Sequence, residues 1–328
     1  MNGLYPLKFE PIFKDYIWGG NNLSEKLNKK IPKGFTRCAE SWEISSVQDN
    51  ISVVSNGYLA GNNLQELIEV YMGDLVGDKI YEMFGDEFPL LIKLIDATDT
   101  LSIQVHPDDT TAKKRHHAFG KTEMWYIINS EKDSKIITGF NTSLNKEEFT
   151  KHLNGNTLPR ILNIENANPG DYFFIPAGRV HAIGKGILLA EIQQTSDITY
   201  RLYDWGRVNK NGKPRDLHTD LALDVIDFKL YDSYKNSSPS TPNKTSELVK
   251  CDYFNVNRLT FNKSIGRDYN LLDSFVIYLC LEGGVNIIYD KGMSETLQPG
   301  ETILIPAEIK DLILKPTKLA TILEIFIK

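Results

Sequence analysis

Residues 170–181, GDYFFIPAGRVH, constrain the fold of this chain more than any other stretch. Residues 172–175 are apolar and predict a short strand, and Pro176 with Gly178 predicts the turn that follows it. His181 therefore stands at a fixed point where the chain reverses direction. A histidine held in this way can bind a metal ion, and other parts of the chain are then expected to supply the remaining ligands.

The spacing within this stretch resembles the second signature of the cupin superfamily, in which glycine, proline, glycine and histidine recur at fixed offsets. Cupins are small β-barrels whose mouths bind a metal or a sugar. The resemblance implies a mainly β fold with two jelly-roll-type cupin barrels, because the pattern occurs twice. PGDYFFIPAGRVHAI begins at Pro169, and PGETILIPAEIKDLI repeats its Pro-Gly-acid and Ile-Pro-Ala residues from Pro299.

The second copy has Asp311 where the first has His181, and Ser274 is expected at the place of Glu123. We therefore expect residues 1–232 to form a catalytic metal-binding cupin domain and residues 247–328 a second cupin domain without metal ligands. Residues 233–246 are rich in serine, proline and asparagine, which is typical of a linker. Apolar residues at helical spacing predict a helical insert at about residues 62–86, and shorter helices are expected near residues 22–29, 145–153 and 216–228.

Metal ligands are expected on strands that precede the opening motif. Side chains alternate along a strand, so Gln104 and His106 in LSIQVHPDD share one face. Glu123 begins the next strand, in GKTEMWYII. With His181, these residues offer two imidazoles, a carboxylate and a neutral amide oxygen, a set typical of a catalytic zinc ion with an open coordination position. The remaining histidines are expected to be solvated: His116, His117, His152 and His218.

The overall composition argues against some classes of partner. Asp and Glu number 43 against 37 Lys and Arg, so the net charge is −6 and nonspecific attraction to nucleic acid or to an anionic membrane is disfavoured. The first residues lack a signal-peptide pattern, and no apolar run approaches the roughly 18 residues of a membrane span. We expect a cytoplasmic protein with no obligate protein partner. The three cysteines are scattered and indicate neither a disulfide framework nor a thiolate zinc site.

Several strings taken together resemble type I mannose-6-phosphate isomerases in their shorter bacterial form. These strings are WGG, LSIQVHPDD, GKTEMWYI and PAGRVHAIGKGILLAEIQQTSDITYRLYDWGR, and the resemblance covers about residues 16–206. It implies one zinc ion per chain, with ligands from Gln104, His106, Glu123 and His181. It also implies a catalytic role for Arg201, a small phosphorylated sugar as substrate, and a part in carbohydrate metabolism.

An aldose–ketose isomerase must move a proton between two carbons through an enediolate, so a base is required. Glu191 is the candidate, since strand alternation aims it inward and burial is expected to raise its pKa. Glu191 could equally orient a metal ligand or Arg201 by a hydrogen bond. Arg201 carries a permanent charge and a fixed fork of donors, which suits it to stabilise the enediolate or to anchor the sugar.

An acidic protein that binds a phosphorylated sugar needs a local group of cations. Lys93, Lys121 and Arg207 lie next to the motif strands and match basic positions of the family, so they are assigned to the substrate, with Ser102 as a hydroxyl donor. Lys93 interrupts the apolar run LLIKLI, where a charge is costly unless it points into a polar cavity.

Two other functions use the same ligand types. Two histidines and a carboxylate also form the iron site of oxygenases, so a cupin metal-dependent oxygenase is one alternative. A non-catalytic sugar-binding cupin is the other. The isomerase is favoured because it alone explains Gln104, the GKTE string and the YRLYDWGR segment together.

Overall fold

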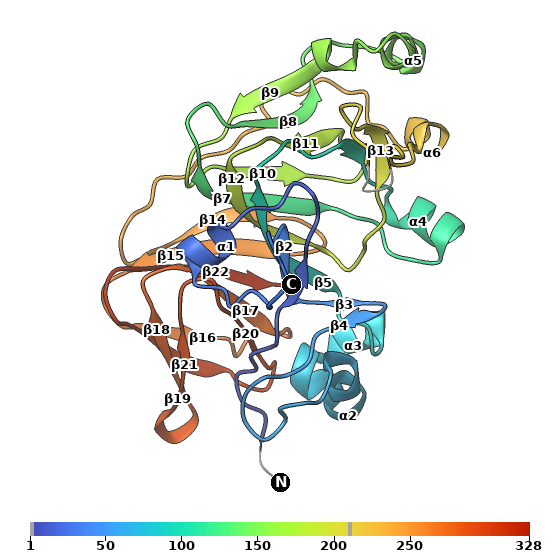
Figure 1. Cartoon of the computed structure of the whole chain (residues 1–328). Helices are drawn as coiled ribbons and strands as arrows, with labels where there is room; N and C mark the ends of the chain where they lie inside the picture. Colours follow the sequence, from blue (N-terminus) through green and yellow to red (C-terminus); the bar gives the residue numbers. More distant parts are fainter. Residues whose placement is uncertain (1–2, 209–211) are drawn as a thin grey trace.

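A computed structural model describes residues 3–208 and 212–328 (Figure 1). The chain is mainly β, as expected, and its strands form two pairs of antiparallel sheets that fit a cupin fold. The hydrogen bonds within the described part of the chain form open sheets and do not close them into a continuous barrel. Figure 1 shows the green and yellow strands of the first pair above the orange and red strands of the second.

The first pair of sheets carries Gln104, Glu123 and His181, and His106 follows directly after one of its strands. Its six-stranded sheet has the order β1 (Ile12–Lys14), β2 (Glu40–Ile44), β5 (Leu90–Ala97), β12 (Ile187–Gln194), β7 (Glu123–Ser130) and β10 (Tyr172–Ile175). Its five-stranded sheet has the order β13 (Tyr200–Tyr203), β6 (Ile103–Val105), β11 (His181–Ile183), β8 (Lys135–Phe140) and β9 (Leu162–Asn166). A small ribbon of β3 (Ser46–Val47) and β4 (Asn50–Ile51) lies apart from both sheets.

The second pair of sheets repeats the order of the first. One sheet has the order β14 (Lys244–Lys250), β15 (Asn255–Phe261), β22 (Ala320–Phe326), β17 (Val276–Glu282) and β20 (Thr302–Ile305). The other has the order β16 (Ile265–Asp268), β21 (Asp311–Pro316), β18 (Val285–Tyr289) and β19 (Met293–Leu297). The division of the chain into domains at residues 232 and 247 stays a prediction.

The strand register corrects one sequence expectation about this repeat. In the first copy Ile175 pairs with Glu123, and in the second copy the corresponding Ile305 pairs with Val276. Val276, and not Ser274, therefore occupies the position of Glu123. The sequence could not place this residue because a strand's register depends on its partner strand.

The helices lie outside the sheets. They are α1 (Asn22–Leu27), α2 (Leu64–Val76), α3 (Asp78–Phe84), α4 (Asp109–His116), α5 (Lys146–Asn154) and α6 (Thr219–Leu223), with 3₁₀ turns η1 (Leu158–Arg160) and η2 (Asp290–Gly292). The expected helical insert is therefore present as α2 and α3. Asn63 caps α2, because its side chain accepts a hydrogen bond from the Glu66 backbone N–H. The Glu66 side chain in turn accepts one from the Asn63 backbone N–H. Within the described residues no helix combines the length and apolar character needed to cross a membrane.

The helix expected over residues 216–228 is shorter than predicted. It begins at Thr219 and ends at Leu223. Beyond it, the backbone N–H of Asp227 donates to the carbonyl of Gly178 at 2.8 Å, in the turn that precedes β11. This tertiary hydrogen bond replaces a helical one, which a pattern of local apolar spacing does not reveal.

One hydrophobic cluster joins the six-stranded sheet of the first pair to the second pair of sheets. Leu7, near the start of the chain, pairs with Leu304 of β20, and the end of α2 accepts a hydrogen bond at Val76 from the Phe275 backbone. The rings of Phe88 and Phe275 lie 4.5 Å apart between centroids, and both are fully buried. The first residues and α2 therefore pack on the second pair of sheets, although they precede the strands of the predicted metal ligands in sequence.

Candidate metal centre and active site

The turn before β11 holds His181 in place as expected. Gly178 has a φ of +88°, a conformation that favours glycine, and a Cβ there would lie 2.8 Å from the Val225 carbonyl. The His181 Nδ1 atom donates to the Arg179 carbonyl at 2.8 Å, and the His106 Nδ1 atom donates to the Ile198 carbonyl at 2.8 Å. Each hydrogen bond fixes its ring so that Nε2 is the atom available to a metal ion.

His106, Glu123 and His181 meet in one buried cluster. Their potential ligand atoms all lie within 4.8 Å of one another. The His106 Nε2 atom lies 3.5 Å from Glu123 Oε2, and the His181 Nε2 atom lies 3.4 Å from Glu123 Oε1. The structure contains no other such group among the residues that it describes.

Several polar atoms of this cluster have no hydrogen-bond partner. They are His106 Nε2 and both carboxylate oxygens of Glu123, and all of them are shielded from solvent. Buried polar atoms without partners are costly, so native proteins rarely retain them without a ligand or an ion. A divalent cation between the three side chains would engage all of these atoms, and the residues present therefore fit a metal ion.

Gln104 lies beside this cluster. Its side-chain amide is 3.3 Å from His181 Nε2, and in the sheet Gln104 pairs with both His181 of β11 and Arg201 of β13. Residues opposite one another in antiparallel strands point to the same face. Arg201, Gln104 and His181 therefore form a row on one face of the sheet. Thr138 continues this row opposite His181, and its buried hydroxyl has no hydrogen-bond partner.

Burial sets the protonation of the cluster. Burial lowers the pKa of His181 to about 3, and burial with the nearby charge of Lys121 holds the pKa of His106 well below its ordinary value. Both imidazoles are therefore neutral at pH 7, which is the form that binds a metal. Burial, followed by repulsion from the Glu191 carboxylate, raises the pKa of Glu123 to about 8.

Glu191 and Lys93 form a buried ion pair next to the cluster. The Lys93 Nζ atom donates to Glu191 Oε1 at 2.9 Å, and the indole N–H of Trp125 donates to Glu191 Oε2 at 2.8 Å. Although burial acts to raise the pKa of Glu191, the charges of Lys93 and Lys121 lower it to about 2. The increase expected from the sequence is therefore wrong, because the charges of Lys93 on β5 and of Lys121 just before β7 outweigh desolvation.

Lys93 is buried, as its place in an apolar run suggested. Besides Glu191, it lies 3.9 Å from Glu40 Oε2, and its Nζ atom lies 5.1 Å from the ring centre of Trp42. Although burial disfavours its charge, Glu191 and Glu40 raise the pKa of Lys93. Sequence reasoning missed Glu40, Trp42 and Trp125. Strand periodicity puts Glu40 and Trp42 on one face of β2, but only the strand register shows which group each residue meets.

The other predicted substrate residues have different surroundings. Lys121 is buried, with Nζ 3.5 Å from Glu123 Oε2, and Ser102 is buried directly before β6. Arg201 donates from Nη1 to the Asp216 carbonyl at 2.9 Å, and its buried Nε atom has no partner.

Arg207 is already engaged within the chain. It donates from Nη2 to Asp204 Oδ1 at 2.6 Å and from Nη1 to the Thr100 carbonyl at 2.7 Å. Asp204 also accepts hydrogen bonds from Arg215 at 2.6 and 2.7 Å. A substrate phosphate would therefore have to compete with Asp204 for Arg207.

His218 differs from the surface residue that the sequence suggested. It is half-buried, and its Nδ1 atom accepts a hydrogen bond from the Arg201 backbone at 3.1 Å. His116 is exposed, but its Nε2 atom lies 2.7 Å from the Tyr200 hydroxyl. Both histidines pack against β13, which a sequence pattern alone could not show.

The fold and the cluster define a cupin with a buried site of two histidines and one carboxylate. A protein-family model described as "Phosphomannose isomerase type I, catalytic domain" matches residues 6–143 of this chain. Mannose-6-phosphate isomerase ManA of Bacillus subtilis is 39% identical over 291 residues, 85% of this chain and 86% of the relative. The mannose-6-phosphate isomerase of Streptococcus mutans is 33% identical and covers 93% of both chains. The chain belongs to the type I phosphomannose isomerase family.

Solved structures support this assignment. The mannose 6-phosphate isomerase of Bacillus subtilis has a TM-score of 0.88 at 32% identity, over 98% of this chain and 99% of that one. A variant of the phosphomannose isomerase of Salmonella typhimurium has a TM-score of 0.82 at 17% identity and covers 99% of this chain, which shows a shared fold. The expected resemblance to this enzyme family is therefore confirmed.

Proposed function

We propose that this enzyme interconverts mannose 6-phosphate and fructose 6-phosphate and that it uses one zinc ion per chain. The observation that carries the proposal is the buried cluster of His106, Glu123 and His181, whose unpartnered atoms fit a divalent cation. The names of the relatives support the substrate. Zinc is the ion that best matches two neutral imidazoles and a carboxylate with a further position open. Gln104 is the fourth candidate ligand, since a 180° flip of its side-chain amide would place the amide oxygen, in place of the nitrogen, next to His181 Nε2.

The proposed reaction moves a proton between C2 and C1 of the sugar and passes through an enediolate. When bound, zinc would supply Lewis acidity to the adjacent sugar oxygens. Arg201 would stabilise the negative charge of the enediolate or anchor the sugar, and its place in the row with Gln104 and His181 supports this role. Thr138 is a further hydroxyl on that row.

Glu191 is better suited to position other groups than to accept the proton. A pKa of about 2 makes the carboxylate a weak base at neutral pH, because a good base titrates near the working pH. We propose that Glu191 orients Lys93, which then faces the substrate together with Lys121 and Ser102. Arg207 would add a contact to the phosphate if one of its N–H donors turned from Asp204 to the substrate. The phosphorylated sugar is the proposed partner of these cations.

The two alternative functions predict different results in one assay. We expect the purified enzyme to contain about one zinc per chain and to convert mannose 6-phosphate to fructose 6-phosphate, with turnover lost to a chelator and restored by zinc. Bound iron with substrate-dependent oxygen uptake would favour the oxygenase, and sugar binding without turnover would favour a binding protein. A cytoplasmic location and the absence of an obligate protein partner stay predictions.

A further inference from the structure

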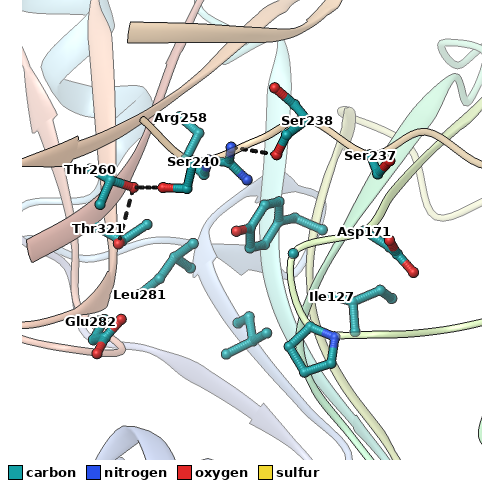
Figure 2. A pocket seen from close by; sticks show the side chains of 14 residues that line it. Ile127, Asp171, Ser237, Ser238, Ser240, Arg258, Thr260, Leu281, Glu282 and Thr321 are labelled. Carbon is teal, nitrogen blue, oxygen red and sulfur yellow. Dashed lines mark hydrogen bonds between the residues drawn. The ribbon is translucent and has the colours of Figure 1, made fainter. Parts of the chain in front are cut away.

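A polar cavity lies between the two pairs of sheets, and none of its lining residues belongs to the cluster of His106, Glu123 and His181. Its volume is about 550 Å³, within the range of small-molecule sites. Its walls come from β7 and the turn before β10 on one side, and from β15, β17 and β22 on the other. Residues 237–240, which the sequence suggested were part of a linker, lie along one edge (Figure 2). We call this cavity the Arg258 cleft.

Arg258 is a buried cation without an ion-pair partner among the described residues. Its exposed fraction is 3%, and within the described residues its side chain makes one hydrogen bond, from Nη2 to the Ser238 carbonyl at 2.8 Å (Figure 2). No carboxylate of the described chain lies within ion-pair distance of it. A guanidinium has five N–H donors, so most of its capacity is unused. A buried charge is costly unless it is paired, which points to an anionic ligand.

Hydroxyl groups stand beside this guanidinium. Ser240 Oγ donates to Thr260 Oγ1 at 2.9 Å, and Thr260 Oγ1 lies 3.3 Å from Thr321 Oγ1. Arg258 and Thr260 are two residues apart on β15, so both side chains face the cleft. Figure 2 shows this row of hydroxyls next to the arginine. An arginine beside a hydroxyl with a free O–H is a combination that binds phosphate oxygens.

Two carboxylates also line the cleft. Asp171 accepts a hydrogen bond from the Asn168 backbone at 2.9 Å and lies 3.5 Å from Lys235 Nζ, so its charge is largely balanced. Glu282 is exposed to solvent. Carboxylates bind hydroxyl groups well, so these two acids suit the polar remainder of a ligand whose phosphate lies on Arg258.

We propose that the Arg258 cleft binds a small phosphate-bearing metabolite, with Arg258 as its ionic ligand and the linked hydroxyls of Ser240, Thr260 and Thr321 beside it, whose mutual hydrogen bonds leave one O–H free to donate to the phosphate. This site is separate from the metal cluster. It does not depend on the catalytic reaction proposed above, because it rests on the unpaired buried arginine and the cavity around it.

The test uses inorganic phosphate as the probe on the full-length protein. Calorimetric titration at constant ionic strength is expected to show saturable binding in the wild-type chain. Arg258→Met removes the charge but keeps a long side chain, and it is expected to weaken binding by about tenfold or more. Arg258→Lys keeps the charge without the fork and is expected to bind with intermediate affinity. Thr260→Val, nearly isosteric, tests the hydroxyls even if Arg258→Met does not fold.

Lys121→Ala is the matched control, because Lys121 is a proposed phosphate contact of the catalytic site. Phosphate binding that survives in Lys121→Ala and is lost in Arg258→Met supports the proposal. Binding that is lost in Lys121→Ala and unchanged in both Arg258→Met and Thr260→Val overturns it, as does the absence of any saturable binding in the wild-type chain.

A second titration identifies the source of the phosphate. The binding of glucose 6-phosphate and of inorganic phosphate to the Lys121→Ala protein is compared. The double variant Lys121→Ala/Arg258→Met is the reference for each compound. Tighter, Arg258-dependent binding of the sugar phosphate indicates a sugar phosphate as the occupant, and equal affinity indicates free phosphate. Both results support the shared phosphate chemistry, whereas binding of either compound that does not depend on Arg258 contradicts it.

Discussion

Glu191 and Lys93 form a buried ion pair that acts electrostatically on Glu123 of the candidate metal site. Both side chains are buried, and each is held by more than one polar contact. The second pair of sheets repeats part of this arrangement, since Glu324 stands opposite Tyr278 as Glu191 stands opposite Trp125. There the aromatic donor is Tyr269, whose hydroxyl donates to Glu324 Oε1 at 2.5 Å, and Arg267 is the cation, at 2.5 Å from the same oxygen. A buried carboxylate between an aromatic donor and a cation is therefore a feature of both halves, which favours a structural contribution from Glu191.

Loss of this ion pair should destabilise the folded protein. Glu191→Gln leaves Lys93 buried without its nearest anion, so we expect the free energy of unfolding at pH 7 to fall by about 3 kcal/mol. Denaturant unfolding measures this change. The double variant Glu191→Gln/Lys93→Met is the control, and it should recover much of the loss because it leaves no unpaired charge. An unchanged stability in Glu191→Gln would show that the pair is energetically neutral.

The same pair predicts a pH dependence. The folded pKa of Glu191, about 2, lies below its ordinary value of 4.5, so the fold favours the ionised form. The resulting stabilisation is complete above the ordinary value and is lost as the pH falls through the folded value. In the wild-type protein we expect about 3 kcal/mol of the free energy of unfolding to disappear between about pH 5 and pH 2. This pH-dependent part should be absent from Glu191→Gln. If the free energies of unfolding of the two proteins change in parallel with pH, the lowered pKa of Glu191 is contradicted.

Arg201 gives a prediction about catalysis. Arg201→Ala should keep the metal, because Arg201 is not one of the clustered ligands, and should lower kcat by about a hundredfold if it stabilises the enediolate. Steady-state kinetics with metal analysis measure both effects, and Arg160→Ala, at an exposed arginine, is the control. A rise in KM alone would make Arg201 an anchor for the substrate.

At the scale of elements, the exact pairing of short strands places the ligands. Alternation along the strand predicted that Gln104 and His106 share a face, and the turn at Pro176 and Gly178 predicted the position of His181. The sequence could not predict that Trp125 and Lys93 meet Glu191, or that Val276 replaces Ser274, because these facts depend on the register between strands that are distant in the chain.

Gly184 provides a prediction at this scale. It follows β11, and a Cβ at this position would lie 2.2 Å from the Lys135 carbonyl of β8. Gly184→Ala must therefore separate the two strands, and we expect a loss of about 1–3 kcal/mol in the free energy of unfolding. Gly266→Ala, on β16, is the matched control because a Cβ there would meet no atom within 4 Å. Equal losses in the free energy of unfolding for the two changes would show that the close approach to the Lys135 carbonyl does not cause the destabilisation.

At the scale of the whole molecule, the shared core makes the two pairs of sheets interdependent. One hydrophobic cluster contains residues from both, including Leu90 and Ile92 of β5 and Leu279 of β17. The sequence predicted two repeated units, but it contained no sign of how they pack, so the Arg258 cleft between them could not be predicted. Packing between sheets is determined by complementary surfaces and not by local pattern.

This shared core predicts a single unfolding transition. Phe275→Ala removes a buried ring that packs on Phe88, and we expect it to destabilise the molecule by about 3–5 kcal/mol. Calorimetry should show one transition at a lower temperature, with loss of activity at the same point. Leu271→Ala is the control because Leu271 is fully exposed. Two separate transitions would show that the halves unfold independently.

Three distant strands are proposed to hold one catalytic cation, and a crystal structure with anomalous diffraction measured at the zinc absorption edge tests this claim most directly. We predict one strong anomalous peak per chain, about 2.0–2.2 Å from Nε2 of His106, Nε2 of His181 and a carboxylate oxygen of Glu123. In a zinc-supplemented crystal, no peak at this point, or a peak bound only by other residues, would contradict it.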